Sequence, residues 1–385
     1  MCHTIYLVTR ELYVYSFYHK LGMYLSVFYI RDLKVTHNII KHHYILHLMM
    51  LKFNKNILFT LVGALMLALV SCNSDEDFSE IITPPTSGET GGGETPGPIR
   101  PSNPDGVEYY RPKTSASNDT CNVVYEYMPA PGQFINELKT GGFNGSQTTL
   151  PAANDYAMAR LKKNLFVSLG AFGGYIVVGF DHSIDNTGGY DFGILGNMFK
   201  NSSEPGVVWV MQDTNGDGLP NDTWYELQGS ETGKATTIQD YEVTYYRPTE
   251  PGQPVKWTDN KGGEGEIDYL KNFHDQEYYY PLWIEEDAYT LSGTKLEARN
   301  YDQSGKGSYW VLPAYDWGYA DNFSNVDRPA DAPRMNKFKI SNAIDKDGKP
   351  ADLDFIDFVK VQSAVQSKSG WLGEVSCEIT SVVEL

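Results

Sequence analysis

Histidine and cysteine are scarce in this chain once its first 71 residues are set aside. Six of the eight His precede Cys72, which leaves His182 and His274. Zinc centres and histidine-based acid–base catalysis usually draw on several imidazoles, so neither is expected. The same part of the chain also lacks a G-x-S-x-G elbow, a G-x-x-x-x-G-K-[ST] loop and an H-E-x-x-H pair.

Basic side chains are few as well. The first 71 residues hold seven of the 31 Lys and Arg and two of the 49 Asp and Glu, so 24 basic and 47 acidic side chains follow them. A surface with that excess of negative charge repels nucleic acid and suits either solubility or cation binding. We therefore expect no nucleic-acid partner.

A targeting signal begins at Met50. Lys52 and Lys55 precede an apolar run over residues 57–70, and Ser71 and Cys72 end it, which predicts a secretory signal peptide over 50–71. The ending LVSC resembles the bacterial lipoprotein box, in which Cys72 is lipidated. A transmembrane anchor is the alternative, but no basic stop-transfer signal follows. Residues 1–49 lie upstream of a complete signal and are interpreted as a mis-annotated upstream extension.

The segment after Cys72 is acidic and then rich in Pro and Gly, with almost no bulky apolar residue. Such a composition cannot bury enough surface to fold, so residues 72–115 are predicted to form a flexible tether. The acidic cluster directly after Cys72 resembles the export signal of Bacteroidetes lipoproteins. It implies an outer-membrane protein, lipid-anchored and facing the cell exterior.

Short alternating apolar segments separated by turn residues fill the chain from Cys121 onward. Strands are predicted at 121–128, 165–170, 174–180, 190–196, 206–212, 223–229, 241–247, 295–299, 337–341, 355–365 and 374–382. One helix is predicted over 151–164, with Pro151 in its first turn. The pattern predicts an all-β fold, an antiparallel β-sandwich or jelly roll over 116–385, with an aromatic-rich insert at about 230–335.

Two cysteines remain in this domain, Cys121 and Cys377. In an oxidising compartment they form either a disulfide between the first and last strands or two separate thiols.

An oxygen-rich segment, MQDTNGDGLPNDTWYE, spans residues 211–226. Its spacing matches positions 1, 3, 5, 6 and 7 of an EF-hand-type loop, although position 12 is Trp224 where that loop has a bidentate Glu. The predicted ligands of a structural Ca²⁺ are Asp213, Asn215, Asp217, the Leu219 carbonyl and Asp222, with Glu226 as a less favoured substitute for Asp222. The alternative is a plain tight turn, since Asn-Gly and Asp-Gly pairs form turns without metal.

Aromatic residues are concentrated in the insert. Tyr315, Trp317 and Tyr319 alternate, so on an extended segment they face one way. With Trp310 and Trp283 they are predicted to form an exposed ligand-binding face, because Trp and Tyr offer flat apolar platforms with polar tips. The alternative is that these rings simply pack in strands.

Acidic residues give little support to an enzyme. Glu285, Glu286 and Asp287 are adjacent, and neighbouring residues on a strand point to opposite faces, so they do not form an acid–base pair. No catalytic residue is predicted.

Several segments carry a family resemblance: GGYDFGILGN (188–197), SSEPGVVWVMQDTNGDGLPNDTWYELQGSE (202–231), YEVTYYRP (241–248), and IDFVKVQSAV with GWLGEVSCEI (356–379). Together they resemble a family of Bacteroidetes cell-surface lipoproteins over about residues 120–385. The resemblance implies a jelly-roll-like domain, in some relatives joined to PKD-type modules. Some relatives look like accessory proteins of uptake loci for vitamin B12 and other corrinoids.

The resulting expectation is a non-catalytic surface lipoprotein that captures a nutrient. The ligand would be a corrinoid such as vitamin B12 or a glycan, passed to a TonB-dependent outer-membrane transporter. The alternatives are a structural or adhesive surface module and a carbohydrate-active enzyme.

Overall fold

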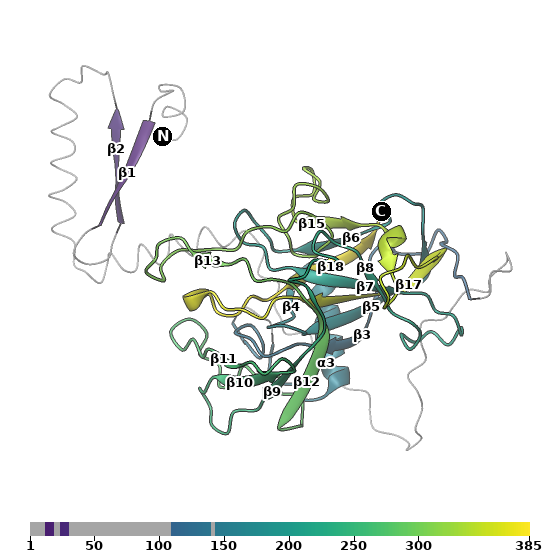
Figure 1. Cartoon of the computed structure of the whole chain (residues 1–385), viewed down its shortest axis with the longest axis horizontal. Helices are drawn as coiled ribbons and strands as arrows, with labels where there is room; N and C mark the ends of the chain where they lie inside the picture. Colours follow the sequence, from purple (N-terminus) through teal and green to yellow (C-terminus); the bar gives the residue numbers. More distant parts are fainter. Residues whose placement is uncertain (1–11, 19–23, 31–108, 140–142) are drawn as a thin grey trace. The chain divides into compact units, whose positions relative to one another are not determined.

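The computed structural model describes residues 12–18, 24–30, 109–139 and 143–385 (Figure 1). They fall into two units. In the first, β1 (Leu12–Tyr18) pairs antiparallel with β2 (Tyr24–Ile30). The predicted signal peptide and Cys72 lie outside the described residues. Among the residues that are described, no helix combines the length and the apolar character needed to cross a membrane.

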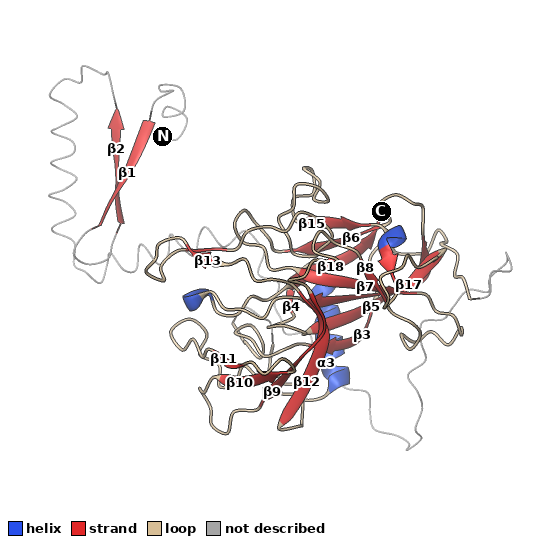
Figure 2. Cartoon of the chain, in the orientation of Figure 1, coloured by secondary structure: helices blue, strands red, loops and turns tan. Residues whose placement is uncertain are grey.

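The second unit is a β domain with one α-helix (Figure 2). Its strands are β3 (Val123–Met128), β4 (Val167–Ser168), β5 (Tyr175–Asp185), β6 (Phe192–Gly196), β7 (Gly206–Met211), β8 (Tyr225–Leu227), β9 (Ile238–Tyr246), β10 (Val255–Asp259), β11 (Glu264–Ile267), β12 (Ala288–Lys295), β13 (Tyr301–Asp302), β14 (Trp310–Val311), β15 (Met335–Phe338), β16 (Ala343–Ile344), β17 (Phe355–Ser363) and β18 (Glu378–Glu384). Two 3₁₀ turns, η1 (Ile340–Asn342) and η2 (Gly370–Leu372), complete it.

Two antiparallel sheets form the sandwich. One has the order β16-β8-β7-β17-β5-β3 and the other β15-β6-β18-β4. Val124, Val178, Val359 and Val210 lie in register across the first sheet, and all four are buried. They share one apolar core with side chains of β6, β15 and β18. The structure confirms the predicted antiparallel β-sandwich with one short helix.

The helix α3 (Leu150–Leu161) lies close to the predicted 151–164. Thr149 caps it by accepting a hydrogen bond from the Ala152 amide at 3.4 Å, and Pro151 occupies the first turn, where its missing N–H costs nothing. Ala153, Ala157 and Leu161 are buried, which fixes the helix against the edge of the sandwich beside β3.

The aromatic-rich insert contains a further sheet, of order β11-β10-β9-β12. Tyr245 on β9 donates its hydroxyl to the Phe172 carbonyl at 2.8 Å, which ties this sheet to the sandwich. The predicted strand 295–299 is wrong, because β12 ends at Lys295. β10, β11 and β12 were not predicted, since their polar residues on the solvent side hide the alternation.

The β domain begins earlier than predicted. Arg111 is buried, its Nη2 lies 2.7 Å from Asp357 Oδ1, and its Nη1 donates to the Phe180 carbonyl at 2.7 Å. A buried guanidinium needs such partners, so residues 109–115 are part of the folded domain. The predicted tether, 72–115, is therefore too long at its C-terminal end.

Both cysteines of the domain are buried and free, which corrects the proposed disulfide. The Cys121 amide donates to the Val382 carbonyl, so Cys121 lies beside the C-terminal part of β18. Cys377 precedes β18 and is separated from Val382 by about 16 Å of extended chain at about 3.3 Å per residue. A disulfide requires Cα atoms closer than about 7 Å.

Candidate functional site

The predicted aromatic face is not an open surface. Tyr315 and Tyr319 are each only 2 % exposed, and their ring centroids lie 5.6 Å apart. The Tyr315 hydroxyl donates to the Glu297 carbonyl at 2.5 Å, and the Tyr319 hydroxyl accepts the Glu231 amide at 3.0 Å. These two rings fill a small second core, and the alternative reading, that they pack, is correct for them.

Trp310 and Trp317 lie in different surroundings. Trp310 is half-buried against the same second core. Trp317 lines a separate cavity of about 260 Å³. Gly318 has a φ of +88°, so residues 315–319 are not one straight strand, and Trp317 lies outside the core that Tyr315 and Tyr319 fill. The alternation that predicted a common face fails for this reason.

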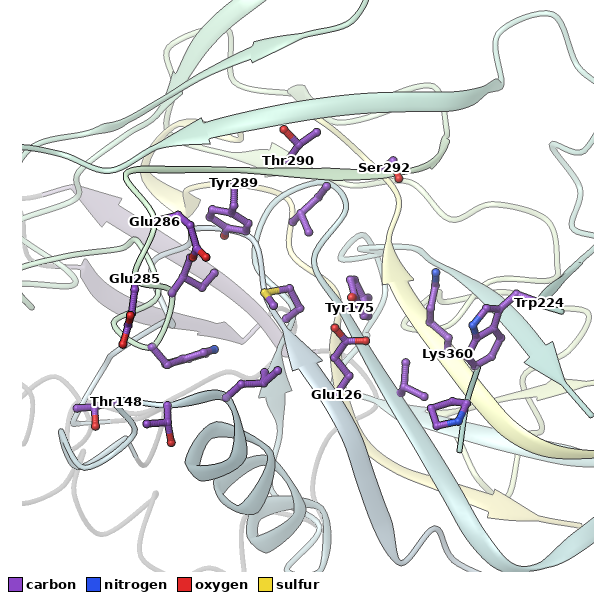
Figure 3. Close-up of a pocket in the computed structure, with 18 residues that line it drawn as sticks. Glu126, Thr148, Tyr175, Trp224, Glu285, Glu286, Tyr289, Thr290, Ser292 and Lys360 are labelled. Carbon is purple, nitrogen blue, oxygen red and sulfur yellow. The ribbon is translucent and has the colours of Figure 1, made fainter. Parts of the chain in front are cut away.

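A larger cavity, of about 770 Å³, lies over the other face of the six-stranded sheet (Figure 3). Of the predicted ligand-binding residues, Trp283 lines it. Its floor comes from β3, β5 and β17, and β12 of the insert crosses above it. The N-terminus of α3 and the loop before β12 close one end.

Four side chains gather at the opposite end of this cavity: Glu126 on β3, Tyr175 on β5, Lys360 on β17 and Trp224 just before β8. The Lys360 ammonium lies 5.1 Å from the Tyr175 ring centroid and 5.7 Å from that of Trp224. Trp209 on β7 offers a third ring at 5.2 Å. The three ring faces stabilise a cation that has lost most of its water.

Burial changes the pKa values of the ionisable side chains at this end of the cavity. Desolvation lowers the pKa of Lys360, and the carboxylates of Glu126 and Glu226 partly offset that effect. Desolvation also raises the pKa of Glu226 to about 7, although its hydrogen bond from Thr294 and the charge of Lys360 oppose the rise. An ammonium between two acids offers hydrogen-bond donors and acceptors side by side.

The predicted calcium loop connects β7 to β8, and its side-chain oxygens accept hydrogen bonds from backbone amides of the same loop. Asp213 Oδ1 accepts the Gly216 amide at 2.7 Å, and Asp213 Oδ2 accepts the Gly218 amide at 3.0 Å. Asp217 Oδ1 accepts the Leu219 amide at 2.8 Å. The calcium prediction stays a prediction beside the plain turn.

The other predicted ligands of this loop are held in the same way. Asn215 Oδ1 accepts the Asp217 amide at 2.8 Å, and Asp222 Oδ2 accepts the Thr214 amide at 3.2 Å. The loop ends against the large cavity, because Pro220 and Trp224 line it. This segment therefore contributes part of the cavity wall.

A second acidic group was not predicted. Carboxylate oxygens of Glu204, Asp321 and Glu378 lie within 4.8 Å of one another, and in the part of the chain that the structure describes they form no ion pair with a basic side chain. Burial raises the pKa of Asp321 to about 7 and that of Glu378 to about 8. Carboxylates so close together are stabilised by protons or by a divalent cation.

These residues left faint signals in the sequence. Lys360 interrupts the apolar strand FIDFVKVQS, and Glu126 interrupts VVYEYM. A charge inside a strand that is otherwise apolar marks a polar patch on one face. The trio of Glu204, Asp321 and Glu378 comes from three distant segments, and no local pattern announces it.

No family model matches the chain, and no curated protein matches it either. The resemblance to Bacteroidetes cell-surface lipoproteins therefore stays a prediction.

Proposed function

We propose that this protein is a non-catalytic cell-surface lipoprotein that captures a nutrient ligand, a corrinoid such as vitamin B12 or a glycan, for uptake by an outer-membrane transporter. The observation that carries the proposal is the 770 Å³ cavity. Binding sites for small molecules are typically concave, about 300–1,000 Å³, and lined by aromatic rings with a few polar groups. This cavity combines Tyr175, Trp224, Trp283 and Tyr289 with one ammonium.

The capture surface rests on the rigid part of the molecule. Glu126, Tyr175 and Lys360 stand on three adjacent strands whose alternate residues are buried in the sandwich core. Side chains on paired strands are held in fixed relative positions, which lowers the entropy lost when a ligand binds. This arrangement suits recognition without a moving lid.

The lipid anchor is the part of the proposal that rests on sequence alone. The signal peptide over 50–71 and Cys72 precede a segment rich in Pro, Gly and acids. A lipidated Cys72 followed by such a tether would hold the β domain at the membrane surface while leaving the cavity accessible to the medium.

Calcium is proposed as a structural ion of the 213–222 loop. Asp213, Asn215, Asp217 and Asp222 supply side-chain oxygens within one short hairpin connection, and extracellular calcium is concentrated enough to fill weak sites. Because Trp224 follows the loop and lines the cavity, calcium would also stabilise one wall of the ligand site.

Isothermal titration calorimetry of the full chain tests capture. We expect heat of binding with either cyanocobalamin or a member of a glycan panel, in buffer containing calcium. The absence of heat with both classes would contradict the proposed function.

A further inference from the structure

The outer face of the six-stranded sheet carries a row of charged and aromatic side chains. The strand register places them in the order Glu126, Val177, Lys360, Trp209, Glu226. Residues directly opposite on paired strands point to the same face. The row therefore presents acid, base and acid along one line beneath the cavity.

Lys360 is the donor at the centre of this row. In the part of the chain that the structure describes, its ammonium contacts ring faces and forms no ion pair with a carboxylate. An ammonium has three N–H donors, and a ring face satisfies them only weakly. A ligand oxygen in the cavity would gain a charge-assisted hydrogen bond there.

Trp283 also lines the cavity. It is 5 % exposed, and within the described ranges its indole Nε1 is buried without an acceptor. Leaving a buried N–H without an acceptor costs about 1–3 kcal/mol. This N–H is not accessible from the cavity, so Trp283 offers a ligand its ring and no hydrogen bond.

The charge of the lining restricts the class of ligand. Glu126, Glu285 and Glu286 stand against the single positive charge of Lys360. Glu285 and Glu286 are exposed, and Figure 3 places them together at the end away from Lys360 and Trp224. Carboxylates at both ends of the cavity repel an anionic ligand, and the Lys360 ammonium repels a cationic one from the end that holds Trp224.

We infer that the cavity binds a neutral sugar, with one pyranose ring stacked on Trp224, one hydroxyl accepting a hydrogen bond from Lys360 and another hydroxyl donating to Glu126. This inference rests on the proposed capture function and selects the glycan over the corrinoid. A hydroxyl both donates and accepts, so two hydroxyls of one sugar can match an ammonium and a carboxylate that stand on either side of β5. The flat apolar face of a sugar matches an aromatic ring.

Calorimetry on the full chain tests the inference with defined probes. The neutral probes are malto-, cello-, manno-, galacto- and xylo-oligosaccharides, the acidic probe is an oligogalacturonate, and the third class is cyanocobalamin. We expect at least one neutral oligosaccharide to bind. Lys360→Met, Glu126→Gln and Trp224→Ala should each weaken that binding by at least tenfold.

Matched variants control for folding. Lys256→Met removes an exposed Lys on β10, and Trp371→Ala removes a Trp that is 44 % exposed and does not line the cavity. Both should bind as the unchanged protein does. Trp224→Tyr keeps a stacking ring and should lose no more than about threefold, which separates lost stacking from a lost fold.

The outcomes that overturn the inference differ from those that overturn capture. Binding of cyanocobalamin or oligogalacturonate without any neutral sugar would overturn the inference and leave capture standing. Equal binding of a neutral sugar by all three cavity variants would do the same, because the site would lie elsewhere. Absence of binding with every probe would overturn both.

Discussion

The two faces of the six-stranded sheet differ although they are built from the same strands. On the inner face, Val124, Val178, Val359 and Val210 form an apolar row that is buried in the sandwich. On the outer face, the adjacent residues of β17, β7 and β5, and Glu126 beyond the register shift in β3, put Lys360 in register with Trp209 and, through Val177, with Glu126. One residue along a strand separates a side chain of the core from one of the cavity.

This difference assigns the two faces to different tasks. Inner side chains contribute stability by removing apolar surface from water, and they offer no group for recognition. Outer side chains hold charge in a partly buried place, which does little for stability and much for ligand binding. Substitutions on the two faces should therefore have separable effects.

The largest effect on stability is expected on the inner face. Ile176 pairs with Val361 and Tyr127 and is fully buried. Ile176→Ala should lower the free energy of unfolding by about 2–5 kcal/mol, because it removes buried methyl groups and leaves a void. Urea unfolding followed by circular dichroism measures this, and a loss below about 1 kcal/mol would contradict the assignment of that face to the core.

The acidic group of Glu204, Asp321 and Glu378, on the other side of the sandwich, should give the next largest effect on stability. Burial raises the pKa of Glu378 to about 8, well above its value in an unfolded chain. The folded protein therefore holds a proton that the unfolded chain releases, so stability should fall as pH rises from about 5 to about 8. Glu378→Gln keeps the shape and should flatten that fall.

Thermal melting between pH 5 and pH 8 in EDTA measures this prediction. An equally steep fall in Glu378→Gln would show that other groups cause it. Glu242→Gln, an exposed acid on β9, serves as the control and should leave the pH profile unchanged.

Removing calcium from the 213–222 loop should have a smaller effect on stability. The effect should extend to the outer face of the sheet, which the loop adjoins. At about ten times its dissociation constant, a bound ion stabilises the folded state by about 1.4 kcal/mol. EDTA should therefore lower the melting temperature, and Asp217→Asn should remove most of that difference. Asp347→Asn, on another exposed turn, should not. Melting that is the same with and without EDTA would identify the segment as a plain turn.

The smallest change in stability is expected on the outer face. Lys360→Met replaces a desolvated ammonium by an apolar group of similar length, so unfolding free energy should change by no more than about 1 kcal/mol. Burial lowers the pKa of Lys360, which shows that its charged form is already disfavoured there. A loss of several kcal/mol in urea unfolding would mean that Lys360 is a structural ion and not a recognition group.

The sequence predicted the strands that alternate clearly and the helix, because burial of one face leaves apolar residues at the regular spacing of a strand or a helix. It missed β10, β11 and β12, whose solvent-facing residues are polar. It placed the ligand site at Tyr315 and Tyr319 because their alternate spacing implies a common face. That implication holds only on a straight strand. The structure gathers the cavity from β3, β5, β12 and β17, and their neighbourhood depends on sheet order, which local spacing does not contain.

A crystal structure of the protein soaked with the tightest-binding neutral oligosaccharide tests the central claim most directly. We predict electron density for one sugar ring against Trp224, with hydroxyl oxygens within hydrogen-bonding distance of Lys360 Nζ and the Glu126 carboxylate. Density beside Trp317 instead, with none between Trp224 and Lys360, would contradict the assignment of the outer face to ligand capture.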